Sequence, residues 1–74
     1  MDKAAVALDV LAKVSGKPRE TLSSEKELVA DLGIDSPKAL QLLADLEDAL
    51  KIEIGDDDAA RMNTVGDIMA FVSR

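Results

Sequence analysis

Ser36 is the side chain of this 74-residue sequence whose type and position are best suited to chemistry. It ends the run DLGIDS at residues 31–36 and is followed by Pro37. Serine is a favoured helix N-cap and proline is favoured at the first helical position, so a helix capped by Ser36 is predicted here. A helix N-terminus stabilises negative charge, so a phosphoester on Ser36 would be tolerated between Asp35 and Lys38. Taken alone, the pattern is better explained by an ordinary N-cap.

The composition argues against an enzyme. The sequence contains no histidine and no cysteine, so it lacks the usual general base, the commonest metal ligand and any thiol nucleophile. It also lacks a phosphate-binding glycine loop, and residues 56–58, although all acidic, do not have the spacing of an EF-hand calcium loop. We therefore predict no catalytic residue and no metal site.

Negative charge is concentrated in the middle of the chain. Residues 25–58 hold eleven acidic and three basic residues, a net charge of −8 in a chain whose total is −6. Such a field repels nucleic acid and anionic membranes and attracts basic protein surfaces, although acidity also serves solubility alone. The N-terminal residues resemble neither a signal peptide nor a membrane span, so a cytoplasmic protein without membrane insertion is expected.

Hydrophobic periodicity predicts an all-α domain over residues 1–74, with three longer helices and one short one. The first helix is expected from about Lys3 to Val14, with Asp2 as its cap. The second runs from Ser36 to near Lys51. Residues 56–62 form the short helix, and Thr64 starts the last one in a capping box with Asp67. The apolar face of the second helix is predicted to comprise Ala39, Leu42, Leu43, Leu46, Ala49 and Leu50.

The first connection, residues 16–35, is unusually long and should carry structure of its own. One helical turn is expected at residues 24–28. Gly33 is expected to adopt a positive φ in a tight turn before the second helix. The residues predicted to anchor this loop in the core are Leu22, Leu28, Val29, Leu32 and Ile34.

The run LVADLGIDS at residues 28–36 resembles the signature of the acyl carrier protein family, whose serine receives 4′-phosphopantetheine. Residues 46–50 also resemble the acidic second half of the family's second helix. Residues 52–57 resemble its loop into the short third helix, and residues 64–67 resemble the start of its last helix. The order of elements agrees over nearly the whole chain. The resemblance implies a four-helix bundle of acyl-carrier type. It also implies a carrier of acyl thioesters on a phosphopantetheine arm at Ser36, in fatty acid, polyketide or related biosynthesis. A dissociated pathway is expected because the domain begins at Met1.

The same resemblance implies a set of partners and a monomeric protein. The partners are a phosphopantetheinyl transferase and acyl-loading and acyl-processing enzymes with basic docking surfaces. The family usually has leucine after the serine and acidic or neutral residues at the positions of Lys38 and Gln41, so a specialised carrier is indicated. The expected docking residues on the second helix are Pro37, Leu40, Gln41, Ala44, Glu47 and Asp48.

Acyl-carrier proteins hide acyl chains between their helices, although core packing alone explains each apolar residue here. The residues expected to line such a pocket are Leu46, Leu50, Ile54, Met62 and Ile68. Two other functions remain open from the sequence. A peptidyl or aminoacyl carrier would share the fold and the serine, and an unmodified acidic interaction module would not need Ser36.

Overall fold

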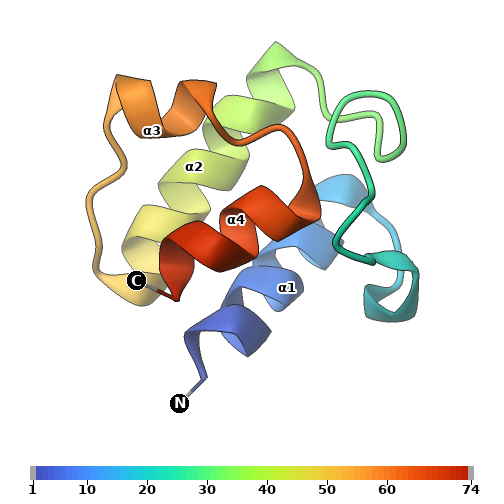
Figure 1. The fold of residues 1–74 in the computed structure, drawn as a ribbon, viewed down its shortest axis with the longest axis horizontal. Helices are drawn as coiled ribbons and strands as arrows, with labels where there is room; N and C mark the ends of the chain where they lie inside the picture. The colour runs from blue at the N-terminus through green and yellow to red at the C-terminus, as the bar shows by residue number, and fades with distance from the viewer. Residues whose placement is uncertain (1, 74) are drawn as a thin grey trace.

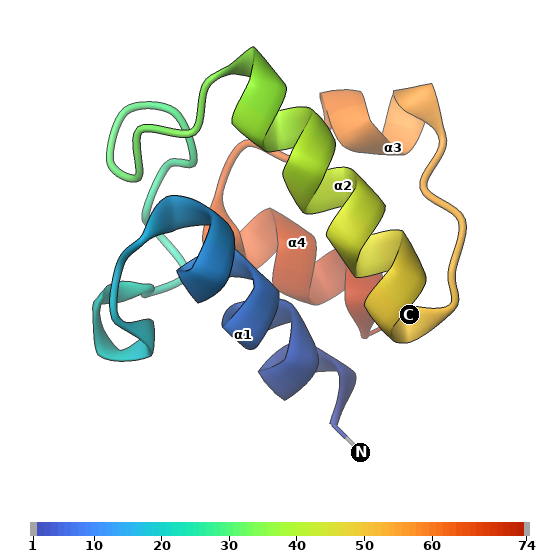
Figure 2. The same ribbon diagram turned by 180° about the vertical axis from the view of Figure 1, so that it is seen from behind.

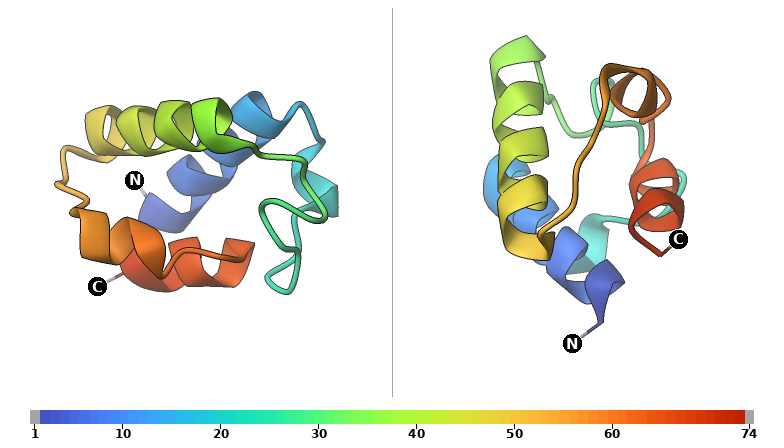
Figure 3. Two further views of the ribbon diagram at one scale, coloured as in Figure 1. Left: turned by 90° about the horizontal axis from the view of Figure 1, so that it is seen from above. Right: turned by 90° about the vertical axis from the view of Figure 1, so that its left-hand side faces the viewer.

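A computed structural model describes residues 2–73, which form four α helices and no strand. The helices are α1 (Lys3–Ser15), α2 (Ser36–Leu50), α3 (Asp56–Ala60) and α4 (Val65–Val72), as Figure 1 shows. Helix α1 packs against both α2 and α4. Side views place α2 on one side of the molecule and α3 and α4 on the other (Figure 3). The predicted all-α bundle with a short third helix and a long first loop is confirmed.

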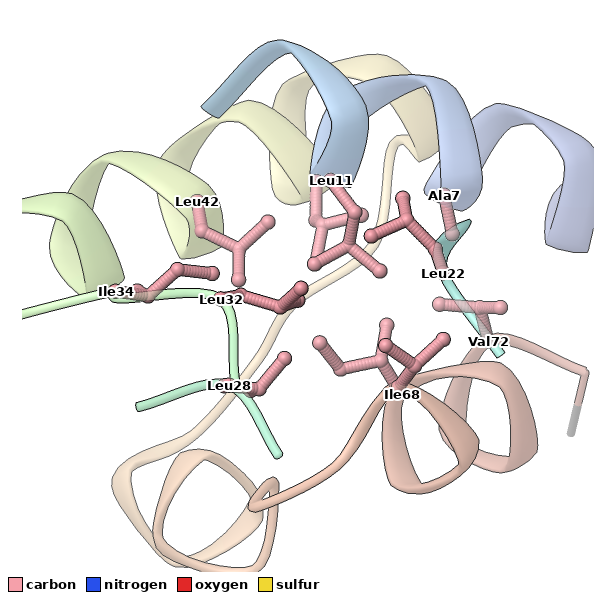
Figure 4. Close-up of a cluster of buried hydrophobic side chains, with 11 residues drawn as sticks. Ala7, Leu11, Leu22, Leu28, Leu32, Ile34, Leu42, Ile68 and Val72 are labelled. Atoms are coloured by element: carbon pink, nitrogen blue, oxygen red, sulfur yellow. The ribbon is translucent and has the colours of Figure 1, made fainter. Parts of the chain in front are cut away.

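Eleven buried apolar side chains form one core, to which all the longer helices and the loop contribute (Figure 4). Ala7 and Leu11 come from α1, whereas Ile68 and Val72 come from α4. All eleven are aliphatic, and the half-buried Phe71 packs against them from α4. The other buried residues are Leu22, Leu28, Leu32, Ile34, Leu42, Leu46 and Val65.

The ends of α1 follow the sequence signals. The Asp2 side chain accepts a hydrogen bond from the Ala4 N–H at 3.1 Å, as an N-cap does. At the other end Gly16 adopts φ 72° and its N–H reaches the Ala12 carbonyl. The predicted helix is confirmed and extends one residue further, to Ser15.

The long loop contains a helical turn, but at a different place from the predicted one. Figure 2 shows this loop joining the end of α1 to the start of α2. Its 3₁₀ turn, η1, spans Arg19–Thr21 and follows Pro18, whose carbonyl accepts bonds from both the N–H and the hydroxyl of Thr21. The prediction of a turn at residues 24–28 was wrong, because the backbone of that segment is bonded to another part of the chain.

Residues 24–28 pair with residues 63–66, at the start of α4. The Leu28 N–H donates to the Asn63 carbonyl at 2.9 Å, and the Val65 N–H donates to the Lys26 carbonyl at 3.0 Å. The Gly66 N–H donates to the Ser24 carbonyl at 2.9 Å, and a Cβ at Gly66 would lie only 3.0 Å from that same oxygen. This pairing fixes the loop against α4 and explains why a glycine stands in the first turn of that helix.

Helix α4 begins in a complete capping box. The Thr64 hydroxyl accepts from the Asp67 N–H at 3.1 Å, and the Asp67 carboxylate accepts from the Thr64 N–H at 3.1 Å. The same carboxylate also accepts from the Asn63 N–H at 2.9 Å. The backbone hydrogen bonds from Asn63 and Thr64 lower the pKa of Asp67. The predicted capping box is confirmed.

Two predicted core positions are exposed instead. Val29 is 73% exposed, because its neighbours Leu28 and Leu32 occupy the core positions of the loop. Ala49 is exposed because α2 buries the stripe through Leu42 and Leu46, and Ala49 lies beyond its edge. Across residues 2–73, every helix is too short or too polar to span a lipid bilayer.

Candidate functional site

Ser36 is the first residue of α2 and its side chain is exposed. The loop fixes it from the N-terminal side. Ile34 is only 2% exposed and its N–H donates to the Leu28 carbonyl at 2.9 Å. Gly33 makes the turn before it with φ 66°, the predicted positive value, and donates to the Val29 carbonyl. A buried anchor two residues away therefore holds an exposed hydroxyl in place.

Asp35, rather than Ser36, is the N-cap of α2. Its carboxylate accepts from the Lys38 N–H at 3.1 Å, and Pro37 consequently occupies the second helical position. The assignment of Ser36 as N-cap was wrong because aspartate caps helices as well as serine does, and the preference of proline for the first position was misleading. The correction matters chemically, since no hydrogen bond of the Ser36 hydroxyl is found within residues 2–73 and this oxygen is not needed to cap the helix.

The backbone at this helix end offers few donors to an anion. Pro37 has no N–H, and the Lys38 N–H is already bonded to Asp35. The positive end of the α2 dipole remains, together with the exposed Lys38 ammonium, which makes no ion pair in the described part of the chain. A phosphate on Ser36 would therefore be neutralised by Lys38 and the helix dipole rather than by a backbone cradle.

An exposed face of α2 continues from Ser36. Leu40 is 69% exposed, an unusual value for a large apolar side chain. Gln41 is exposed and donates from Nε2 to the Asp45 carboxylate at 2.8 Å. Five of the six residues predicted to dock partners are exposed and recur at helical spacing along this face: Pro37, Leu40, Gln41, Ala44 and Asp48.

Glu47 differs from these five residues. It is half-buried, and its Oε2 accepts a hydrogen bond from the Ile54 N–H at 2.9 Å. The carboxylate is therefore used inside the molecule, whereas the adjacent Asp48 side chain is 90% exposed.

A pocket of about 90 Å³ lies beside the serine, between α2, α3 and the long loop. Ile34 and Ala39, two and three residues from Ser36, are in its wall. The volume exceeds the ~15 Å³ that one water needs, but the apolar lining suits a hydrocarbon better than water. The remaining wall residues are Leu28, Val29, Leu42, Leu43, Ala59, Met62 and Ile68.

The pocket shares only part of its wall with the predicted set. Met62 and Ile68 line it, whereas Leu46, Leu50 and Ile54 do not. Leu46 is fully buried in the core. The sequence reasoning missed the loop side of the pocket, although the apolar residues directly before Ser36 are the signal from which it follows.

Comparisons with known proteins agree with this geometry. The family model for a phosphopantetheine attachment site matches residues 5–72. An acyl carrier protein from an Exiguobacterium species is 37% identical over 75 residues, covering 97% of this chain and 95% of the relative. An acyl carrier protein from Syntrophobacter fumaroxidans is 36% identical over 77 residues, covering 100% of this chain and 95% of the relative.

Solved structures give the same answer. A protein from Mycobacterium tuberculosis described as an acyl carrier protein superposes with a TM-score of 0.87 and 32% identity, covering 96% of this chain and 95% of its own. The acyl carrier protein of Enterococcus faecalis superposes with a TM-score of 0.78 and 25% identity, covering 97% and 95%. Family, sequence and structure together show that the chain belongs to the acyl carrier protein family, whose members have a phosphopantetheine attachment site.

Proposed function

We propose that the chain is a carrier, not an enzyme, which holds acyl groups as thioesters on a 4′-phosphopantetheine arm attached to Ser36. The observation that carries this proposal is the exposed Ser36 hydroxyl, which is not needed as the N-cap because Asp35 caps the helix. A chain without cysteine has no thiol of its own, so a thioester requires a thiol borrowed from a cofactor.

The attachment chemistry needs only what this site has. The Ser36 hydroxyl loses its proton and forms a new Oγ–P bond, while the pyrophosphate bond of coenzyme A breaks and adenosine 3′,5′-bisphosphate leaves. Lys38 and the positive end of α2 favour the phosphodiester that results. The catalytic groups belong to the transferase, which agrees with the absence of histidine in this chain.

The exposed face of α2 supports the second half of the proposal, transient docking. Its partners would be a phosphopantetheinyl transferase and the acyl-loading and acyl-processing enzymes of a fatty acid, polyketide or related pathway. The apolar Pro37 and Leu40 lie near the serine, and Asp48 lies further along the same face. Acidic charges increase the rate of encounter with basic surfaces more than they tighten the complex, so a monomeric carrier leaves each enzyme quickly.

The pocket beside Ser36 would shelter the acyl group between visits. A tethered acyl chain is always at high effective concentration near the pocket, so weak apolar contacts are enough to retain it. We propose that the acyl chain enters past Ala39 and Met62, in the wall of the pocket. It would reach Leu46, Leu50 and Ile54 only when the pocket widens.

Intact-mass measurement tests the attachment. The purified chain is incubated with coenzyme A and a promiscuous phosphopantetheinyl transferase, and one added phosphopantetheine is expected. Ser36→Ala should abolish the addition, and Ser23→Ala, which removes an exposed hydroxyl from the long loop, should leave it intact. Addition to Ser36→Ala, or none to the wild type, would contradict the proposal. Loading by an adenylating enzyme instead of an acyl or malonyl transferase would indicate a peptidyl or aminoacyl carrier.

A further inference from the structure

Glu47 makes a contact that its acidic neighbours do not make. Its Oε2 accepts from the Ile54 N–H at 2.9 Å in a part-buried position, and its own carbonyl accepts from the Ile52 N–H at 3.2 Å. Asp48, by contrast, has a 90% exposed side chain and lies 4.0 Å from the Lys51 ammonium. Glu47 therefore joins α2 to the connection that leads into α3.

This junction matters because α3 buries little of its own surface. It is five residues long, has no fully buried residue, and its N-cap Gly55 provides no side-chain hydrogen bond. A helix of this length is not stable on its own. Its placement therefore depends on residues 52–62, here called the α3 arm, of which Ile52, Ile54 and Met62 pack against the core. Glu47 holds the start of the α3 arm, and the bond from the Leu28 N–H to the Asn63 carbonyl holds the residue that follows it.

The α3 arm forms one wall of the pocket beside Ser36. Ala59 and Met62 line that pocket from the α3 arm, opposite Ala39 and Leu43 of α2. The bond between Ile54 and Glu47 therefore lies on the same segment as this wall. The half-buried carboxylate of Glu47 is connected by one hydrogen bond to the element that closes the pocket.

We propose that Glu47 is a positioning residue for acyl carriage. Its carboxylate holds the α3 arm, residues 52–62, against α2 and so keeps the acyl pocket closed over the acyl group. This proposal rests on the proposed function, and it assigns Glu47 a role inside the molecule in place of the docking role expected from the sequence. It separates Glu47 from Asp48, which remains on the exposed face that meets partner enzymes.

The two roles require different chemistry. Docking to a basic enzyme requires negative charge, whereas holding the Ile54 N–H requires only an acceptor oxygen. Glu47→Gln removes the charge and retains an acceptor, whereas Glu47→Ala removes both. Asp48→Ala is the matched control, because it removes one negative charge at the next position without touching the α3 arm.

The first measurement is the rate at which hydroxylamine cleaves an octanoyl thioester on the modified chain. Glu47→Ala should accelerate cleavage about fivefold, because losing a hydrogen bond of this kind lowers the equilibrium ratio of closed to open pocket by about that factor. Glu47→Gln and Asp48→Ala should stay within about twofold of the wild type. Equal acceleration by Glu47→Gln and Glu47→Ala, or none by Glu47→Ala, would overturn the proposal.

The second measurement uses the unmodified chain and so does not depend on Ser36. Hydrogen exchange of the Ile54 amide, followed by NMR, should be about tenfold faster in Glu47→Ala and nearly unchanged in Glu47→Gln. If Glu47→Ala does not fold, Glu47→Leu replaces it, because leucine retains an apolar stem without an acceptor. Unchanged exchange in the variant without an acceptor refutes the role of Glu47. Failure of the wild-type Ser36 to accept phosphopantetheine refutes only the proposed function.

Discussion

Helices α3 and α4 are neighbours in the sequence but are held in opposite ways. Helix α4 has a complete capping box at Thr64, and three of its eight residues are buried. Helix α3 has a glycine at its N-cap, no side-chain cap and no buried residue among its five. One helix is fixed by its own sequence, and the other by what its flanking residues contact.

This difference extends to the walls of the pocket beside Ser36. Ile68 of α4 lines the pocket and is fully buried, whereas Ala59 and Met62 line it from a segment that is only half-buried. Under the proposed function, such an arrangement would let the pocket change while the core does not.

The largest expected effect is on α4. Ile68→Ala should lower the free energy of unfolding by about 3 kcal/mol, because it removes a fully buried side chain and leaves a cavity. Ala59→Gly, in α3, should cost only about 1 kcal/mol, the usual difference in helix propensity. Urea denaturation of both variants measures the two values. Similar losses would show that α3 is as important to the core as α4.

The capping box of α4 should give the next largest effect. Thr64→Ala removes the acceptor of the Asp67 N–H and should lower the free energy of unfolding by about 1 kcal/mol. Thr64→Ser retains the hydroxyl and serves as the control. The same urea titration measures both variants, and a Thr64→Ala chain as stable as the Thr64→Ser chain would show that the Thr64 hydroxyl does not stabilise α4.

The acid dependence of stability should depend in part on Asp67. Its pKa is lowered in the folded chain, so its contribution is fully present above the usual value of 3.8 and is lost as pH falls through the lowered value. Asp67→Asn should therefore lose less stability than the wild type between neutral pH and about pH 3. Ile68→Val, a variant destabilised in the core, controls for lower overall stability. An unchanged acid dependence in Asp67→Asn would contradict this assignment.

The smallest expected effect is a gain in α3. Gly55 has φ −76° and ψ 168°, the extended conformation of an N-cap, and a Cβ there would contact only Asp58 Oδ2 at 3.7 Å. Gly55→Ser supplies the missing cap and should stabilise the chain by a few tenths of a kcal/mol. Amide hydrogen exchange within α3 should slow about twofold. Faster exchange would mean that α3 is not limited by its cap.

Much of the fold follows from short-range signals in the sequence. Asp2 and Gly16 define α1, Thr64 and Asp67 define the start of α4, and periodic leucines define α2. The long loop was harder to predict, because its conformation depends on partners far away in the chain. The backbone of residues 24–28 is bonded to residues 63–66, and no local pattern shows that pairing.

The candidate site was predictable in its main residue and less so in its details. Ser36 lies at the start of α2, exposed as an attachment point requires, but the exchange of capping roles with Asp35 depends on backbone geometry. Glu47 and Asp48 are adjacent acidic residues that the sequence does not distinguish. They differ in the structure, because only the Glu47 carboxylate accepts a hydrogen bond from a backbone N–H, that of Ile54 after the end of α2.

Attachment of the phosphopantetheine to Ser36 can be checked at the level of a single residue. The chain modified with coenzyme A and a transferase is digested, and the peptides are fragmented in a mass spectrometer to find which hydroxyl bears the phosphopantetheine. All of the modification is expected on Ser36. Modification of Ser23, Ser24 or any other residue, or a chain that competent transferases leave unmodified, would contradict this attachment.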